Sequence, residues 1–284
     1  MPRRCAASAS ARATILPPPN GRVGGKIGRF RYIASVRIID LGTLNYRDAW
    51  QRQEAIHAEV LAGAEEAILL VEHPPTITFG RRAADSASHL VASPDFLERS
   101  NVELVESDRG GDITFHGPGQ LVAYPIVRLA DHRLSVGAYV KTLEHSVIAA
   151  LKPFGIDAFL DVCAIGIWTG KPSAKICALG VRIKRGVSLH GIALNVITNL
   201  DYFNLINPCG LGRPVTSMQK ILGDRCPPMS DVKRVVAEQI AEGLNQPPLP
   251  VLRGRAGEGA AERMLIPHFE DPLPNPPPEY RERE

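Results

Sequence analysis

The chain has 284 residues, of which 44% are hydrophobic and 22% charged, a composition typical of one large or two small folded domains. Its net charge of +3 is uneven, because residues 1–34 hold seven basic residues and no acidic one, which leaves −4 for the remainder. The acidic remainder argues against nucleic acid as the main partner, and the lack of an 18-residue apolar run argues against a membrane span.

Both ends of the chain differ from its middle. Residues 1–34 are rich in Arg and Ala and form a disordered or targeting extension, for which a mitochondrial transit peptide, a disordered segment and a misplaced start codon stay open. From residue 247 to 284, nine of 38 residues are proline, and charges of both signs alternate. Such a stretch buries too little apolar surface to offset its chain entropy, so we expect a disordered tail. We expect residues 35–246 to form a single folded domain.

The middle of the chain alternates predicted strands and helices. Strands are expected over residues 36–40, 67–72, 102–106, 120–126, 174–183 and 187–196. Helices are expected after four polar caps, namely Asn45, Ser93, Ser135 and Ser230. The third has an apolar face of Val136, Val140, Leu143 and Val147, and the fourth one of Val232, Val235, Val236 and Ile240. A hairpin turn at Lys184-Arg185-Gly186 excludes a purely parallel sheet, so the predicted fold is α/β of the α+β type, a mixed sheet with flanking helices.

The segment from Arg109 to Gln120 (RGGDITFHGPGQ) carries four glycines and a proline among twelve residues. Glycine lets a backbone approach a ligand closely, and loops of this kind are often placed for binding or chemistry. His116 lies in the middle of the segment, with Arg109 and Asp112 nearby. The alternative is a tight strand connection in which His116 only satisfies backbone groups.

The five cysteines are odd in number and have no CxxC spacing: Cys5, Cys163, Cys177, Cys209 and Cys226. This predicts a reducing compartment rather than a disulfide framework or a zinc ribbon. Cys209 lies at a bend between Pro208 and Gly210, where backbone N–H groups can stabilise a thiolate or an oxyanion. Cys163 and Cys177 lie in apolar runs and are expected to be buried.

A nucleophilic cysteine needs a nearby cation, because the unperturbed thiol pKa is about 8.5. The candidates are His116, His190 and Lys175, which opens an apolar strand and is either half-buried or a solvated strand end. His73 is a ligand or a capping group. The sequence contains no GxGxxG, GxxxxGK[ST], HExxH or GxSxG motif and no carboxylate cluster with metal-ligand spacing, so no cofactor and no metal is predicted.

Five ordered motifs between Asp40 and Gln239 resemble those of the lipoate-biosynthesis octanoyltransferases, also called lipoyl(octanoyl) transferases or lipoate-protein ligase B. The motifs are EHPPT at 72–76, RGGDITFHGPGQ at 109–120, KICALGVRI at 175–183, HGIALNV at 190–196 and NPCG at 207–210. The resemblance implies the α/β catalytic domain shared with biotin and lipoate ligases. It also implies an acyltransferase, cytoplasmic in bacteria and mitochondrial in eukaryotes.

The resemblance also implies roles for individual residues. Cys209 matches the nucleophile that carries the acyl thioester, and Lys175 matches the lysine that lowers the pKa of that thiol. The implied substrate-binding residues are Arg109, Gly110, Gly111, Asp112, Ile113, Thr114, Phe115, His116, Ala178, Leu179, Gly180, Gly191, Ile192 and Ala193. Cys177 departs from the family, which usually has a small residue there. It is harmless if it faces inward, and a second thiol if it faces the pocket.

The implied reaction moves an octanoyl group from octanoyl-acyl carrier protein to a lysine of lipoyl domains in 2-oxoacid dehydrogenase complexes and the glycine cleavage H protein. The donor is already a thioester, so no nucleotide is needed. An acyl groove burying about six methylenes would contribute roughly 5 kcal/mol. The basic turn of Arg182, Lys184 and Arg185 is either a contact for an acidic carrier or a solvated turn. Rival functions are an ATP-dependent ligase of the same fold, a non-catalytic binding protein, and a papain-like hydrolase using His116.

Overall fold

An eight-stranded mixed sheet dominates the protein, in a computed structural model that describes residues 14–15, 36–81, 89–161, 164–207 and 213–246. Among the described strand pairs of this sheet, only β2 and β3 run parallel. The strands in spatial order are β1 (Thr14–Ile15), β2 (Arg37–Thr43), β3 (Ala67–Glu72), β7 (Gln120–Ile126), β11 (Val187–Asn195), β10 (Ala174–Lys184), β9 (Ile167–Thr169) and β8 (Ala158–Leu160). The expected mixed sheet with flanking helices is confirmed.

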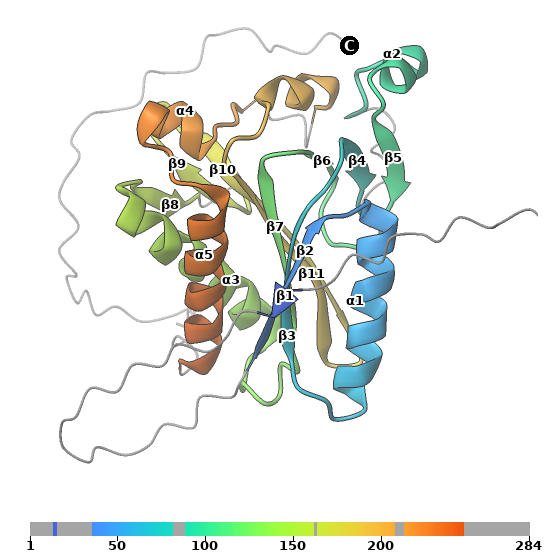
Figure 1. Cartoon of the computed structure of the whole chain (residues 1–284), viewed down its shortest axis with the longest axis vertical. Coiled ribbons are helices and arrows are strands. Elements are labelled where there is room, and N and C mark those ends of the chain that lie inside the picture. The colour runs from blue at the N-terminus through green and yellow to red at the C-terminus, as the bar shows by residue number, and fades with distance from the viewer. Residues whose placement is uncertain (1–13, 16–35, 82–88, 162–163, 208–212, 247–284) are drawn as a thin grey trace, which may run out of the picture. The chain divides into compact units, whose positions relative to one another are not determined.

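Helices cover both faces of the sheet (Figure 1). Helix α1 (Tyr46–Leu61) packs on one face, and α3 (Val136–Leu151) and α5 (Met229–Asn245) pack together on the other. Strand β3 shows the consequence, because successive strand side chains point to opposite faces. Its Ile68 and Leu70 belong to the core under α3 and α5, whereas Ala67, Leu69 and Val71 belong to the core under α1.

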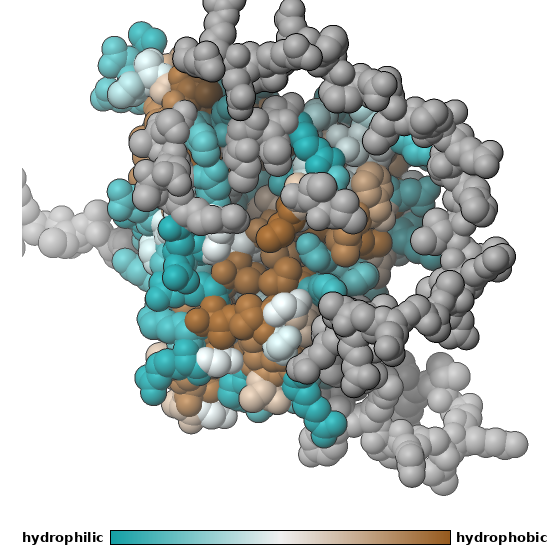
Figure 2. All heavy atoms as spheres, turned by 180° about the vertical axis from the view of Figure 1, so that it is seen from behind, coloured by the Kyte–Doolittle hydropathy of each residue, from teal (hydrophilic) through white to brown (hydrophobic). Residues whose placement is uncertain are grey.

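The helices leave part of the sheet open. Strand β11 is buried along its whole length, whereas most residues of β10 are only partly buried. Seen from behind, hydrophobic residues gather in the middle of one face and hydrophilic residues surround them (Figure 2). Among the described residues, no helix is long and apolar enough to cross a membrane.

A second, three-stranded sheet carries the glycine-rich segment. Its strands are β5 (Glu103–Glu106), β4 (Thr76–Phe79) and β6 (Ile113–His116), with β4 in the middle. Strand β4 pairs parallel with β5 and antiparallel with β6. The segment predicted as a loop from Arg109 to Gln120 therefore contains a strand, which four residues were too few to reveal by alternation.

The predicted strands over 67–72 and 120–126 are confirmed at both boundaries. Two predicted caps are also confirmed. Ser93 accepts the N–H of Phe96 at the start of α2 (Pro94–Arg99), and Ser135 accepts the N–H of Ala138 at the start of α3. Both donors lie three residues after the cap, the usual N-cap geometry.

Three details of the helix predictions are wrong. Asn45 stands at the N-cap position of α1, but its side chain makes no capping hydrogen bond. Helix α5 begins at Met229 after Pro228, so Ser230 lies inside it. Val136 is 52% exposed although its spacing aligns it with the buried Tyr139, Leu143 and Val147, because it is the first residue of α3.

Several short elements were not predicted, because three to six residues carry little periodicity. They are β8, β9, α4 (Met218–Leu222) and the 3₁₀ turns η2 (Lys152–Phe154), η3 (Leu200–Leu205) and η5 (Gly223–Arg225). The expected tail over 247–284 lies outside the described residues. So does the extension over 1–34, except for β1, which pairs with β2.

The hairpin of β10 and β11 turns through two residues, one fewer than expected. Arg185 and Gly186 both have positive φ, 54° and 82°, as a type I′ turn requires. This turn fixes the register, with Lys184 opposite Val187 and Gly180 opposite Gly191.

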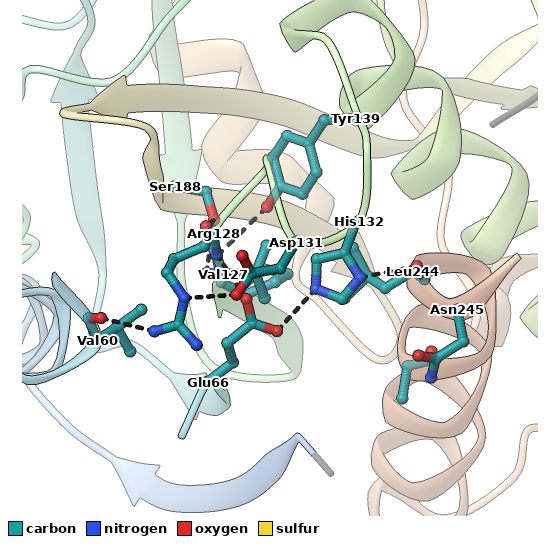
Figure 3. Close-up of polar contacts among 12 residues, drawn as sticks. Val60, Glu66, Val127, Arg128, Asp131, His132, Tyr139, Ser188, Leu244 and Asn245 are labelled. Carbon is teal, nitrogen blue, oxygen red and sulfur yellow. Dashed lines mark hydrogen bonds and ion pairs between the residues drawn. The ribbon is translucent and has the colours of Figure 1, made fainter. Parts of the chain in front are cut away.

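A buried ion pair between His132 and Glu66 joins several element ends (Figure 3). His132 Nε2 lies 2.7 Å from a Glu66 oxygen, and its Nδ1 donates to the carbonyl of Leu244 near the end of α5. The other Glu66 oxygen accepts the backbone N–H of Arg128 at 2.6 Å. The hydrogen bond and charge of Glu66 raise the pKa of His132.

This ion pair should make stability depend on pH. Because the folded-state pKa of His132 lies above the unfolded value of about 6.5, its contribution is complete below that pH and is lost as pH rises through the folded-state pKa. We expect the free energy of urea unfolding to fall over this window in the wild type. His132→Gln still donates a hydrogen bond to Glu66 but does not titrate, so it should lack the part of the fall that His132 causes. His132→Ala should cost about 3 kcal/mol at pH 6. A pH-independent difference between wild type and His132→Gln would contradict this.

Candidate active site

A cavity of about 540 Å³ is lined by strands β7, β11 and β10 and by the segment that connects β5 with β6. The strands contribute alternating side chains that share one face, namely Gln120, Val122 and Tyr124 of β7, Gly191, Ala193 and Asn195 of β11, and Ala178 and Gly180 of β10. Other lining residues come from outside these elements: Tyr46, Val140, Ala164, Ile165, Trp168, Phe203, Arg213 and Val215.

Two glycines let backbone segments meet beside the cavity. A Cβ on Gly180 would lie 2.7 Å from the Gly110 carbonyl oxygen, and one on Gly191 would lie 2.1 Å from the Ala123 carbonyl oxygen. Both distances are shorter than a side chain tolerates, so these positions require glycine. Gly180 of β10 pairs with Gly191 of β11. Gly180 makes room for the 109–111 segment, and Gly191 makes room for β7.

Arg109 attaches the glycine-rich segment to its surroundings. The buried guanidinium donates to the Thr78 carbonyl at 2.7 Å, to the Thr78 hydroxyl and to the Gly110 carbonyl at 3.0 Å. The N–H of Gly110 donates to the Val181 carbonyl of β10 at 3.0 Å. The segment is thus bonded to β4 on one side and to β10 on the other, which holds its backbone against the cavity.

His116 is held in one tautomer by a chain of side-chain amides. Asn195 donates through Nδ2 to the Thr216 carbonyl, and its Oδ1 accepts from Gln120 Nε2, which also reaches the Phe115 carbonyl. Gln120 Oε1 must therefore accept from His116 Nδ1, 2.8 Å away. His116 Nε2 is left as a buried acceptor without a hydrogen-bond partner among the described residues.

Aromatic rings surround this imidazole. Tyr46 stacks on His116 with centroids 5.6 Å apart and on His190 at 6.5 Å. His73 meets His116 edge-on at 5.8 Å and accepts the hydroxyl of Tyr124 at 2.8 Å, because its Nδ1 donates to a backbone carbonyl. His73 is therefore a hydrogen-bonded structural residue.

Burial keeps these imidazoles uncharged near neutral pH. It lowers the pKa of His73 to about 4. Burial, with the nearby His73 and Arg109, lowers the pKa of His116 well below its usual value. Burial also lowers the pKa of His190, although the hydrogen bond to Asp108 opposes this. The histidines that line the cavity, His116 and His190, are thus neutral, and the cationic side chains along it include Arg109, Lys175 and Arg213.

His190 has left-handed backbone, with φ of 57°. Its N–H donates to Gln53 Oε1 at 2.8 Å, and its Nε2 lies 2.6 Å from Asp108. Asp108 also forms an ion pair with Arg182. Burial opposes ionisation of Asp108, but the hydrogen bond from His190 and the charge of Arg182 hold its pKa below the usual range.

The predicted basic turn is partly neutralised within the chain. Arg182 is paired with Asp108, and Lys184 Nζ lies 3.0 Å from Glu54. Arg185 is exposed at the turn itself. The positive charge that this turn offers to solvent is therefore smaller than the sequence indicates.

Lys175 is partly buried, lines the cavity and lies over an aromatic ring. Its Nζ is 4.8 Å from the centroid of Trp168. Its backbone N–H donates to the Pro214 carbonyl, and its carbonyl accepts the N–H of Thr216, both at 2.9 Å. Lys175 is therefore half-buried and not a solvated strand end.

The cavity brings together the residues predicted to bind substrate, with one exception. Phe115 does not line it, because β6 alternates: His116 faces the cavity, while Phe115 stacks on Tyr202 at 4.8 Å in a separate small core. Cys209, the predicted nucleophile, lies outside the described residues, as do Cys5 and Cys163.

The two described thiols do not line the cavity. Cys177 is fully buried in the core under α3 and α5, where burial raises its pKa. Cys177 therefore faces inward and is not a second thiol of the cavity. Cys226 is half-buried beside η5, and burial raises its pKa too.

Three lining residues were not predicted from the sequence: Tyr46, Trp168 and Arg213. Tyr46 opens a helix, Trp168 lies in a strand of three residues, and Arg213 follows the NPCG motif. A polar aromatic residue at the start of an amphipathic helix was the one available signal, for Tyr46. Within the described part of the chain, no group of three His, Cys, Asp or Glu side chains is placed to hold a metal ion.

Residues 45–241 match the family model described as "Lipoyl protein ligase A/B catalytic domain". The octanoyltransferase of Chloroflexus aggregans is 44% identical over 211 residues, covering 73% of this chain and 94% of the relative. The octanoyltransferase of a Roseiflexus species is 42% identical over 234 residues, covering 81% and 97%.

Solved structures show the same fold at lower identity. A lipoate-protein ligase A bound with ATP superposes with a TM-score of 0.63 at 19% identity, covering 74% of this chain and 85% of that one. A bipartite lipoate protein ligase from Thermoplasma acidophilum, studied with its E2 lipoyl domain, gives 0.59 at 17% identity, covering 72% and 82%. On the sequence matches, the chain belongs to the lipoyl protein ligase A/B catalytic-domain family and, within it, to the octanoyltransferases.

Proposed function

We propose that this protein transfers an octanoyl group from octanoyl-acyl carrier protein to a lysine of lipoyl domains, through a thioester on Cys209. The observation that carries the proposal is the cavity, which joins an apolar floor to Lys175. The relatives named octanoyltransferase support the same activity. Acceptors would be lipoyl domains of 2-oxoacid dehydrogenase complexes and the glycine cleavage H protein, in the cytoplasm or, in a eukaryote, the mitochondrion.

The floor of the cavity suits an unbranched acyl chain. Val122, Ala193 and Ala178 form one row across β7, β11 and β10, and Gly191 with Gly180 continues it toward Tyr124. The small side chains of the first row leave this part of the floor open to an apolar chain, whereas backbone carbonyls of Gly110 and Ala123 lie close to Gly180 and Gly191. Burying about six methylenes there would contribute roughly 5 kcal/mol to binding.

Lys175 is the best cation for activating the thiol. Of the three candidates, His116 and His190 have pKa values lowered by burial and are neutral near pH 7. A neutral imidazole cannot stabilise a thiolate by charge, whereas an ammonium within a few ångströms lowers a thiol pKa. His116 Nε2 is placed as an acceptor, but burial disfavours the imidazolium that a papain-like thiolate–imidazolium pair requires.

The chemistry requires two acyl transfers. The Cys209 thiolate attacks the carbonyl carbon of the octanoyl thioester, and the carrier leaves as a thiolate that takes a proton. The lysine amine of the lipoyl domain then attacks the Cys209 thioester, an amide forms, and the Cys209 thiolate leaves. Lys175 would stabilise the thiolate as an ammonium, give its proton to the departing carrier thiolate, and then, as a neutral amine, take up the proton released by the attacking lysine. No nucleotide enters either step.

Replacing Cys209 should abolish transfer, because no covalent intermediate can form. We expect wild-type protein incubated with octanoyl-carrier and no ATP to gain the mass of one octanoyl group, and Cys209→Ala to gain none. Intact-protein and peptide mass spectrometry would measure this. Cys226→Ala is the matched control and should behave as wild type. An acylated peptide containing Cys177 or Cys226, or strict dependence on ATP and free acid, would refute the proposal.

Removing the charge of Lys175 should raise the pKa of the Cys209 thiol. Because alkylation by iodoacetamide proceeds through the thiolate, Lys175→Ala should slow it about tenfold at pH 7, the effect of one pKa unit. The rate is followed on the Cys209 peptide from pH 6 to 10. Lys175→Arg keeps a positive charge and should lose less. An unchanged alkylation profile in Lys175→Ala would remove Lys175 from the mechanism.

The hydrogen-bond chain predicts a single tautomer for His116. We expect ¹⁵N NMR of histidine-labelled protein to show a neutral imidazole protonated at Nδ1 from pH 6 to 8, because burial keeps its pKa well below the usual value. Gln120→Leu removes the Nδ1 acceptor and should allow the Nε2 tautomer. A His116 signal that titrates near pH 6.5 would contradict this assignment.

A further inference from the structure

One buried indole contacts two cations at the edge of the cavity. Trp168 is only 2% exposed and donates its Nε1 hydrogen to the Ala164 carbonyl. Lys175 Nζ lies 4.8 Å from its centroid, and Arg213 Cζ lies 3.7 Å from it. The face of an indole carries partial negative charge and attracts cations, more strongly where water is excluded.

The aliphatic part of Lys175 is confined on the way to this ring. Lys175 stands opposite Trp168 in the pairing of β10 with β9, so both side chains lie on one face of the sheet. A Cβ on Gly166 would lie 3.2 Å from Lys175 Cε and 3.4 Å from Cδ. The stem therefore passes directly over Gly166 before the ammonium reaches the indole.

Arg213 is fixed from the other side. Its guanidinium donates to Asp161 at 2.7 Å and to the Ser173 hydroxyl at 2.8 Å. The next residues, Pro214 to Thr216, bond to the backbone of Lys175. The chain that leaves Arg213 is thus attached both to Trp168 and to Lys175, four residues after Cys209 in the sequence.

We propose that Trp168 is a positioning residue that keeps the Lys175 ammonium charged and in place at the cavity. The inference rests on the proposed function, because it assigns a partner to the lysine of that mechanism. Removing the ring would disfavour the ammonium and release it from its position. Thiolate formation would then need a higher pH, and Lys175 would lose its proton at a lower pH.

Other charged groups act on the same lysine. Arg213 is a like charge on the shared ring and opposes the ammonium. Glu144 of α3 accepts a hydrogen bond from the backbone of Gly166, and burial raises its pKa. The Cys177 thiol of β10 is also nearby, and the charge of Lys175 acts to lower its pKa. Replacing Trp168 also removes the ring from Arg213, which keeps its hydrogen bonds to Asp161 and Ser173.

The test measures octanoyl transfer from carrier to lipoyl domain between pH 6 and 10, with kcat and KM determined separately. We expect Trp168→Leu to lower kcat about tenfold with KM within twofold. In its pH–rate profile, the acidic limb should move to higher pH and the basic limb to lower pH. Trp168→Phe keeps an aromatic face, so it should retain most of kcat, and both limbs of its profile should stay at their wild-type pH. Phe159→Leu removes a half-exposed ring opposite Trp168 in β8 and should change neither limb.

A second measurement needs no change of shape. Fluorination withdraws electron density from the indole face, and the chain has only two tryptophans. In a Trp50→Phe background, replacing Trp168 by mono-, di- and trifluorotryptophan should lower kcat and shift the basic limb in step with fluorine number. This series keeps the inference testable if Trp168→Leu does not fold.

Each failure has its own signature. A uniform fall in rate with unchanged limbs in Trp168→Leu would show that the ring only packs, and a flat fluorination series would show the same. Either result overturns the inference while wild-type transfer persists. If instead the wild type forms no Cys209 thioester, the proposed function fails before Trp168 is tested.

Discussion

The register of the β10–β11 hairpin is the constraint on which the cavity depends. A two-residue type I′ turn at Arg185 and Gly186 sets Gly180 opposite Gly191. Only that pairing clears space for the 109–111 segment on one side and β7 on the other. A slip of one residue would turn every side chain to the opposite face and place Cβ atoms inside neighbouring backbone. The floor of the cavity therefore follows from the turn.

The cavity combines an apolar floor with a polar wall whose histidines are neutral and whose cationic side chains include Arg109, Lys175 and Arg213. The donors and acceptors of this wall are directed by hydrogen bonds, as the chain from Asn195 through Gln120 to His116 shows. Burial keeps its histidines neutral. The guanidinium of Arg109 is occupied by backbone and hydroxyl oxygens. Hydrogen bonds thus hold the polar groups of this wall in fixed orientations.

Backbone pairing unites parts of the site that are distant in sequence. Pro214 and Thr216 bond to Lys175, and the same segment receives the amide of Asn195 at the Thr216 carbonyl. Lys175 is thereby connected to the chain that leads from Cys209 and to the chain of amides that ends at His116. The 214–216 segment therefore contacts both the strand that carries Lys175 and the amide chain that orients His116.

The sequence by itself determined what local pattern can encode. Continuous apolar runs defined the strands at 67–72 and 120–126, the caps Ser93 and Ser135 defined two helix starts, and the glycine spacing at 109–119 indicated a close backbone approach. Tertiary structure decided the rest. It separated Phe115 from His116 by strand alternation, made three histidines neutral by burial, and brought Trp168 and Arg213 to Lys175. These outcomes depend on sheet order and on contacts between residues far apart in the chain, which local periodicity does not carry.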